Sequence, residues 1–148
     1  MDYYSPQNPD YGLWYTFRRA HEAIHKIRKL ELRRFKLSTV ETGVLLIVHE
    51  GHNRVTPAEI SRQLLKDPHS ISQLLVRMAK KGLLKNIKGV PKKNMVQVQL
   101  TPKGEEAYKL STKGNKLNKI MCVLSEKEKK QLISYLDRLR ERAIEEIR

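Results

Sequence analysis

The chain has 148 residues, a formal net charge of +14 at pH 7 and one cysteine, Cys122. A chain of this length forms one domain, or a small domain with arms, and buries roughly 68–70% of its unfolded surface, enough for a core. The charge favours nucleic acid or an acidic surface as partner, against the alternative of a soluble protein that is merely basic. A lone cysteine excludes an intrachain disulfide framework and fits a reducing compartment. We expect a cytoplasmic protein, since neither a signal peptide nor an apolar run near the ~18 residues of a membrane span is present.

The N-terminal residues predict an irregular lead-in followed by a long helix. Residues 1–10 contain Asn8 and two prolines, which favour loops. From Gly12 to Phe35, apolar residues recur at alternating four- and three-residue steps and form one stripe on a helix whose opposite face is basic. The stripe consists of Leu13, Phe17, Ala20, Ile24 and Ile27. The body of the domain or a partner chain must cover it.

Two short helices are predicted next, each with a capping box. Ser38 and Glu41 begin the first, which ends near Gly51. Thr56 and Glu59 begin the second, with a proline at the first helical position.

A third short helix is predicted from Asp67, a good N-cap, to Gly82. Its buried stripe is Ile71, Leu74, Leu75 and Met78. That leaves an outer face of polar and basic residues, His69, Ser70, Ser72, Gln73, Arg77 and Lys80. Val76 does not fit this division, because the helical wheel does not bury it.

A β-hairpin follows, with strands predicted at Leu83–Ile87 and Met95–Leu100. In the second strand Val96, Val98 and Leu100 alternate with two glutamines, the pattern of a half-buried strand. The tip, 88–94, is rich in lysine.

The C-terminal part is predicted to be helical. Thr101 and Pro102 open a helix whose apolar positions continue past Gly114, where we expect a bend. Ser125 and Glu128 form a capping box that starts a last helix. Its apolar stripe consists of Leu132, Leu136, Leu139, Ala143 and Ile147.

The central pair of helices and the hairpin have the order of a winged helix-turn-helix, in which the second helix enters the major groove of DNA. From Pro68 to Gly104 there is no Asp or Glu, which fits a polyanionic partner. Gln73 can pair with adenine, and Arg77 with a guanine edge or a phosphate. For Ser70, an ordinary role in starting the helix stays open. The candidate DNA-binding residues are His69, Ser70, Ser72, Gln73, Arg77, Lys80, Lys88, Lys92, Lys93 and Asn94.

Residues 37–104 resemble the MarR family of winged helix-turn-helix transcriptional regulators. The resemblance is carried by Leu37-Ser38, by the run Ser70-Ile71-Ser72-Gln73-Leu74-Leu75, and by the run Leu100-Thr101-Pro102-Lys103-Gly104 after the wing. Leu124-Ser125-Glu126-Lys127-Glu128 is similar to the start of the family's last helix, so the resemblance covers nearly the whole chain.

The resemblance implies a homodimer with intertwined terminal helices and two winged modules on a roughly palindromic operator. It also implies a repressor that a small molecule or an oxidant releases from DNA. The family's wing usually carries an Asp followed by an Arg near its tip, where this chain has Lys92, Lys93 and Asn94. Wing contacts are therefore expected to be lysine-driven. The family often has a basic residue where Gln73 stands, so its base preference does not carry over.

We divide the chain accordingly into an N-terminal dimerisation arm (1–36), a DNA-binding module (37–104) and C-terminal dimerisation helices (105–148). The apolar stripes of the first and last helices exceed what a small winged module needs to cover. Each could pack within its own chain. Burial between two chains, at about 25 cal/mol per Å² of apolar area, would support an obligate dimer.

The segment His21-Glu22-Ala23-Ile24-His25 matches the H-E-x-x-H pattern of zinc proteases. A protease also needs a third ligand and a substrate cleft, which the sequence does not indicate. A regulatory zinc site could use further nitrogens of His49 and His52. In the simplest interpretation His21 and His25 only pack or form hydrogen bonds. We expect no enzyme activity, metal or cofactor.

Two other features have a structural and a sensory interpretation. Cys122 could sense oxidants if exposed, but its apolar neighbours suggest burial. Five aromatic residues near the N-terminus could line an effector pocket or anchor the arm across a dimer: Tyr3, Tyr4, Tyr11, Trp14 and Tyr15.

The sequence therefore predicts a sequence-specific transcriptional regulator that binds double-stranded DNA as a homodimer. The alternatives are a nucleoid or RNA-binding protein without sequence preference and a zinc-dependent regulator or hydrolase built on His21, Glu22 and His25. Neither the operator nor the effector can be identified from these residues.

Overall fold

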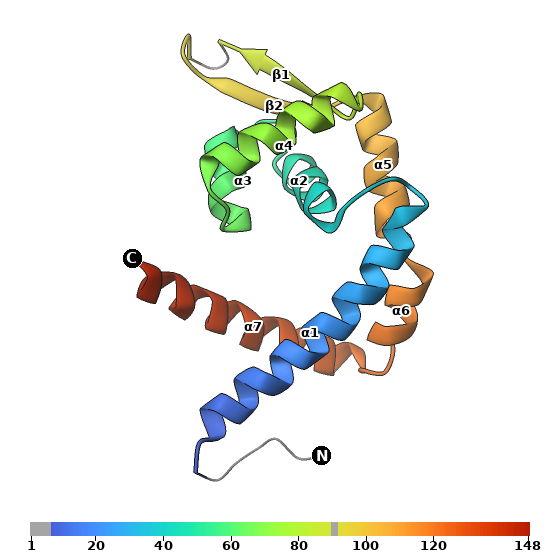
Figure 1. The fold of residues 1–148 in the computed structure, drawn as a ribbon, viewed down its shortest axis with the longest axis vertical. Coiled ribbons are helices and arrows are strands. Elements are labelled where there is room, and N and C mark those ends of the chain that lie inside the picture. The colour runs from blue at the N-terminus through green and yellow to red at the C-terminus, as the bar shows by residue number, and fades with distance from the viewer. Residues whose placement is uncertain (1–6, 90–91) are drawn as a thin grey trace. The chain divides into compact units, whose positions relative to one another are not determined.

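The computed structural model describes residues 7–89 and 92–148 and shows a mainly helical chain with one β-hairpin (Figure 1). The elements are α1 (Pro9–Arg33), α2 (Thr39–Glu50), α3 (Pro57–Leu64), α4 (Pro68–Lys80), β1 (Leu84–Lys88), β2 (Val96–Leu100), α5 (Pro102–Thr112), α6 (Asn115–Met121) and α7 (Glu126–Ile147). The predicted fold class, a winged helix-turn-helix between long terminal helices, is confirmed. The chain divides into two compact units, Met1–Gly114 and Asn115–Arg148.

The first helix begins three residues earlier than predicted, at Pro9 instead of Gly12. Asn8 is its N-cap, because the side-chain oxygen of Asn8 accepts a hydrogen bond of 3.2 Å from the Tyr11 amide. Pro9 then occupies the first helical turn, where a missing N–H costs nothing. The rest of the predicted lead-in, residues 1–6, lies outside the described part of the chain.

The predicted caps set the starts of the later helices. Ser38 with Glu41, Thr56 with Glu59, and Ser125 with Glu128 each form a complete capping box, at the starts of α2, α3 and α7 respectively. Each box satisfies two backbone amides that a helix start otherwise leaves unpaired. The beginnings of these three helices therefore follow from local sequence.

The hairpin is a two-stranded antiparallel sheet in which Leu84 pairs with Leu100 and Lys88 with Val96. Val55, just before α3, adds an isolated bridge to Val98 and ties the hairpin to the helices. The predicted alternation is wrong at one position, since Gln97 is buried. The sheet face that was expected to be polar throughout is therefore partly covered.

One hydrophobic core joins the helix-turn-helix and the hairpin. α2 packs against α3, α5 and β2, while α4 packs against α3 and β1. The core consists of Leu32, Leu37, Val44, Leu45, Ile47, Val48, Val55, Ile60, Ile71, Leu74, Leu75, Met78, Leu83, Leu84, Val98 and Leu100. This packing holds α4 so that its opposite face is turned to solvent.

The helix predicted to bend at Gly114 is interrupted there. α5 ends at Thr112 and α6 starts at Asn115. In the second unit, α7 has no buried residue, and the side chains of Leu132, Leu139 and Ile147 are exposed. Within the described residues, no helix is both long enough and apolar enough to cross a membrane.

Candidate nucleic-acid interface

The outer face of α4 is a continuous row of exposed side chains. Ile71, Leu74, Leu75 and Met78 are buried, as predicted. On the opposite face, residues at alternating four- and three-residue steps form an exposed row, which we call the α4 row: His69, Gln73, Val76 and Lys80. Ser72 and Arg77 flank this row and are also exposed. A helix that shows one exposed, mostly polar row along its length has the form that the major groove accepts.

Within the α4 row, two side chains already contact each other. The Nε2 atoms of Gln73 and His69 lie 3.1 Å apart, at hydrogen-bond distance between positions i and i+4. The pair restrains the Gln73 amide, the group that can pair with adenine. His69 therefore positions Gln73 as well as being a candidate contact itself.

The N-terminus of α4 is capped by the side chain of Asp67. Asp67 accepts hydrogen bonds from the Ser70 amide at 2.8 Å and from the Ser70 hydroxyl at 2.6 Å. The hydrogen bonds from Ser70, the hydroxyl first, lower the pKa of Asp67 below its ordinary value. The Ser70 hydroxyl therefore has the role in starting the helix that the sequence left open as an alternative to a DNA contact.

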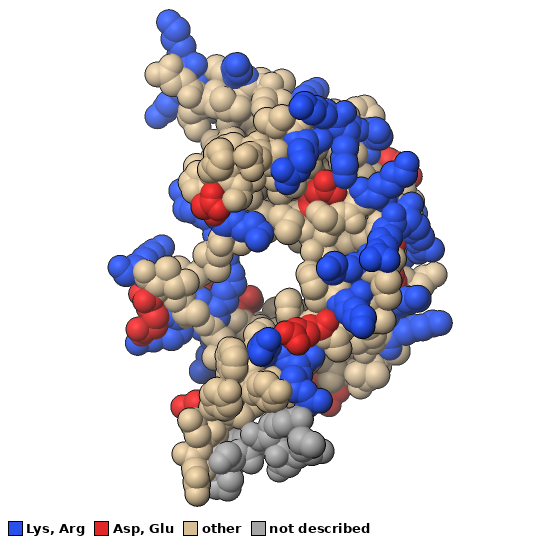
Figure 2. All heavy atoms as spheres, viewed as in Figure 1, with Lys and Arg blue, Asp and Glu red and all other residues tan. Residues whose placement is uncertain are grey.

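The hairpin tip presents the predicted lysines. Lys88, Lys92, Lys93 and Asn94 are all exposed. The Gly89 amide donates to the Met95 carbonyl at 2.8 Å, and the Met95 amide donates to the Lys92 carbonyl at 2.9 Å. Val90 and Pro91 lie outside the described residues. Figure 2 shows basic side chains, in blue, over the part of the molecule that contains the hairpin and α4, with few acidic ones among them.

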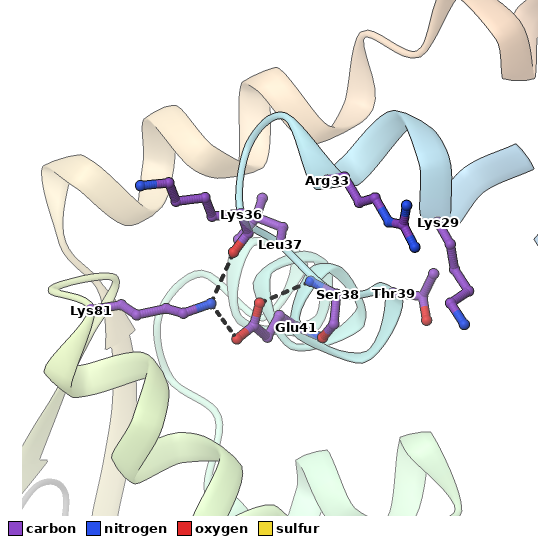
Figure 3. A pocket seen from close by; sticks show the side chains of 8 residues that line it. All are labelled: Lys29, Arg33, Lys36, Leu37, Ser38, Thr39, Glu41 and Lys81. Carbon is purple, nitrogen blue, oxygen red and sulfur yellow. Dashed lines mark hydrogen bonds and ion pairs between the residues drawn. The ribbon is translucent and has the colours of Figure 1, made fainter.

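The C-terminal end of α4 is held by a contact that the sequence analysis missed. Lys81 donates to the Glu41 carboxylate at 2.7 Å and to the Lys36 carbonyl at 2.9 Å (Figure 3). Glu41 also accepts from the Ser38 amide in the capping box of α2. One carboxylate therefore caps α2 and anchors α4. The capping box was visible in the sequence, but no local pattern pointed to Lys81 as its partner.

An open cavity of about 360 Å³ lies beside this anchor. Lys29 and Arg33 of α1 line it together with Thr39, Glu41 and Lys81 (Figure 3). A second cavity of about 240 Å³ lies next to α4 and is lined by Ser38, Ser70 and Arg77 among others. Arg77 therefore lies on the flank of α4 and shares this cavity with Ser38 at the start of α2.

The wing is joined to α4 by a close backbone crossing. Gly82 has φ +78°, a left-handed conformation that favours glycine, and it turns the chain from α4 into β1. A Cβ on Gly104 would lie only 2.1 Å from the Leu83 carbonyl oxygen, so a side chain there would collide with the backbone. The Thr101 amide donates to the same Leu83 carbonyl at 3.1 Å. These contacts fix where the wing leaves the body of the module.

The histidine candidates are engaged in ordinary contacts. The rings of His21 and His25 stack with centroids 5.4 Å apart, and Glu22 pairs with Arg18 at 3.0 Å. His49 contacts Glu105 at 3.1 Å and stacks on Tyr108 at a centroid distance of 4.0 Å. In the described part of the chain, no group of three or more His, Cys, Asp or Glu side chains could hold a metal ion.

Cys122 is exposed, so the expected burial is wrong. It lies just after α6, and its thiol donates to the Lys119 carbonyl at 3.1 Å. The apolar neighbours Met121 and Val123 are exposed themselves and therefore do not enclose it.

The N-terminal aromatic residues form a stacked group on α1. The rings of Tyr11 and Tyr15 stack with centroids 6.4 Å apart, and the Trp14 ring lies 5.5 Å from Tyr11 and 6.5 Å from Tyr15. Tyr11 and Trp14 remain largely exposed. Tyr3 and Tyr4, also expected in this group, lie outside the described residues. The group offers an aromatic surface on α1.

Comparison with known proteins agrees with this geometry. The model of the MarR family matches residues 35–87. The chain is similar to the structure of the organohalide-sensing transcriptional regulator RdhR bound to 2,4-dichlorophenol, with 27% identity, a TM-score of 0.73, and coverage of 88% of this chain and 78% of that one. No curated protein sequence matches the chain.

Two more distant structures share the fold. A mutant of E. coli MarR complexed with operator DNA has 19% identity and a TM-score of 0.75, covering 91% of this chain and 98% of that one. The S. aureus MepR–DNA complex has 18% identity and a TM-score of 0.75, covering 94% of this chain and 99% of that one. The family consists of transcriptional regulators, not enzymes. The family model therefore matches the helix-turn-helix part of the chain, and the chain shares its fold with winged helix-turn-helix transcriptional regulators along most of its length.

Proposed function

We propose that the protein is a homodimeric repressor that binds a roughly palindromic operator and is released from it by a small molecule. The observation that carries the proposal is the α4 row, an exposed and mostly polar face of a helix whose opposite face is buried in the core. Its central glutamine can pair with adenine, and the lysines at the hairpin tip can contact phosphates or the minor groove. The α4 row would supply specificity, and the tip lysines would supply affinity.

The dimer is supported by apolar surface that a single chain leaves open. On α1 the side chains of Leu13, Trp14 and Phe17 are 58%, 50% and 48% exposed. On α7 Leu132, Leu139 and Ile147 are also exposed. Apolar stripes of this kind on long terminal helices favour burial against a second copy. Residues 1–36 and 105–148 would then be the dimerisation arms of the DNA-binding module 37–104.

The small-molecule step is supported by the cavity beside Lys81. A ligand in this space of about 360 Å³ would lie against the Lys81–Glu41 pair that anchors α4 to α2. An anionic ligand could compete with Glu41 for Lys81 and so loosen the end of α4. The similar regulator RdhR is a ligand-bound relative, with 2,4-dichlorophenol as its ligand.

The proposal is tested by selecting genomic fragments that the purified protein binds, and then by gel-shift competition between a selected fragment and random DNA. A repressor of this type would prefer its operator by a factor of about 10³ or more. It would bind one dimer per palindrome. Equal competition by random DNA would contradict the proposal.

The basic, acid-free segment also fits a protein that binds nucleic acid without sequence preference. The lysines of the hairpin tip favour this second candidate, because lysine contacts with phosphates carry no sequence information. The same competition separates the two, since only the repressor distinguishes its operator from random DNA. RNA as competitor would identify an RNA-binding protein.

A further inference from the structure

Val76 is a large apolar side chain in the middle of the α4 row, and its side chain is 54% exposed. Gln73 precedes it in the row and Lys80 follows it, both exposed. The core of the module lies on the opposite side of α4, so no packing among the described residues 7–89 and 92–114 explains a valine here.

Single exposed apolar residues are common on protein surfaces, so exposure alone means little. The position is what distinguishes Val76. Among the described residues of the module 37–104, the other largely exposed large apolar side chains are Leu46 and Leu65, and both lie outside α4. Valine is also a weaker helix former than the alanine, lysine or glutamine that an exposed helical site favours.

We infer that Val76 recognises thymine in the operator by contact of its methyl groups with the C5-methyl of the base. Thymine is the one DNA base that presents a methyl group in the major groove, and apolar side chains are its usual partners. The inference rests on the proposed function, because it requires α4 to lie in the major groove.

The same geometry places this thymine next to the base that Gln73 contacts. Residues 73 and 76 are three apart, which corresponds to a rise of about 4.5 Å along the helix. Successive base pairs are about 3.4 Å apart. The thymine is therefore expected within about one or two base pairs of the adenine bound by Gln73, in each half of the operator.

The test uses the selected operator with each thymine replaced singly by deoxyuridine, which removes only the C5-methyl. For the wild-type protein, one thymine in each half-site should be sensitive, and its replacement should weaken binding about fourfold, as expected for one buried methyl group. For Val76→Ala the same replacement should have no effect. Alanine favours helix, so the variant is expected to fold.

Two further variants sharpen the comparison. Val76→Thr keeps one methyl group and the shape of the side chain, so the sensitive thymine should remain the same with a smaller effect. Leu46→Ala removes an exposed apolar side chain from α2 and should leave the pattern of sensitive thymines unchanged.

The inference is wrong if Val76→Ala and wild type have the same pattern of sensitive thymines. It is also wrong if no thymine is sensitive although the operator is still preferred over random DNA. That second result leaves the proposed function intact. If no DNA sequence is preferred at all, both the proposed function and the role of Val76 are overturned.

Discussion

The ammonium group of Lys81 lies 2.7 Å from the carboxylate of Glu41, although the two residues are 40 positions apart in the chain. The Glu41 side chain is only 7% exposed, whereas that of Lys81 is 41% exposed. The contact connects the residue after α4 to the first turn of α2. The ion pair therefore connects α4, the proposed recognition helix, to α2.

Replacing Lys81 by Met should destabilise the module. In this variant the buried carboxylate of Glu41 keeps its capping hydrogen bond but loses its cation. Because the lost ion pair is partly open to solvent, the free energy of unfolding should fall by about 1–2 kcal/mol. Denaturant unfolding would measure the change in the free energy of unfolding. Lys80→Met is the matched control, because Lys80 is a neighbouring exposed lysine that belongs to the α4 row. It should leave stability unchanged and weaken DNA binding; equal stability of both variants would contradict the role of Lys81.

Replacing Lys92 and Lys93 by Ala should weaken binding to every DNA sequence. Each phosphate contact contributes about 0.9 to the slope of log K against log salt, so two lysines contribute about two units in each bound copy. The slope is obtained from binding titrations at several salt concentrations. Lys127 and Lys130 on α7 are exposed and allow a control with the same change in charge. An unchanged slope for the wing variant would remove the hairpin tip from the interface.

Gln73→Ala should reduce the difference in binding affinity between operator and random DNA. Loss of one bidentate base contact removes about 1–3 kcal/mol of discrimination at that position. Arg77→Ala provides the contrast, because Arg77 lies on the flank of α4 and lines the cavity beside Ser38. It should weaken binding to both DNAs about equally. Competition titrations with the two DNAs would show whether the roles are distributed in this way or reversed.

The pH dependence of stability should include a contribution from Asp67. Its hydrogen bonds with Ser70 lower the pKa of the folded state, so the ionised carboxylate stabilises the fold at neutral pH. This contribution should remain until the pH falls below the ordinary value of 3.8 and should be lost as the pH approaches the lower folded value. Asp67→Asn keeps a good helix cap but cannot titrate. Thermal unfolding measured between pH 7 and pH 3 should therefore show a smaller loss of stability on acidification for Asp67→Asn than for wild type. Identical pH dependences of the two proteins would contradict the prediction.

Replacing Leu13 and Phe17 together by Ser should convert the proposed homodimer into monomers. Both side chains lie on one stripe of α1 and are about half exposed in the single chain. Sedimentation equilibrium would give the mass of each variant. Lys26→Ser, an exposed change elsewhere on α1, should leave the dimer intact. A dimer that persists in the double variant would place the interface elsewhere.

Much of this fold was visible in the sequence because its signals are local. The capping boxes at Ser38, Thr56 and Ser125 fixed three helix starts, since cap and partner are only three residues apart. The buried stripe of α4 follows from helical periodicity, and so does the exposure of the candidate contacts on its other face. Residue types then indicated nucleic acid as the partner, because basic side chains without acids suit a polyanion.

Contacts between residues far apart in sequence were decided only by the tertiary structure. The pairing of Lys81 with Glu41 depends on how α4 packs on α2, and no periodicity encodes that distance. Gln97 alternates like an exposed residue yet is buried, because the surrounding chain covers part of its sheet face. Val76 illustrates the difference between the two kinds of information. The helical wheel predicted that its side chain is not buried, and the structure shows that it is exposed between Gln73 and Lys80 in an otherwise polar row. Local sequence determines where each helix begins and which face is apolar, whereas packing determines which side chains meet and which remain free to contact DNA.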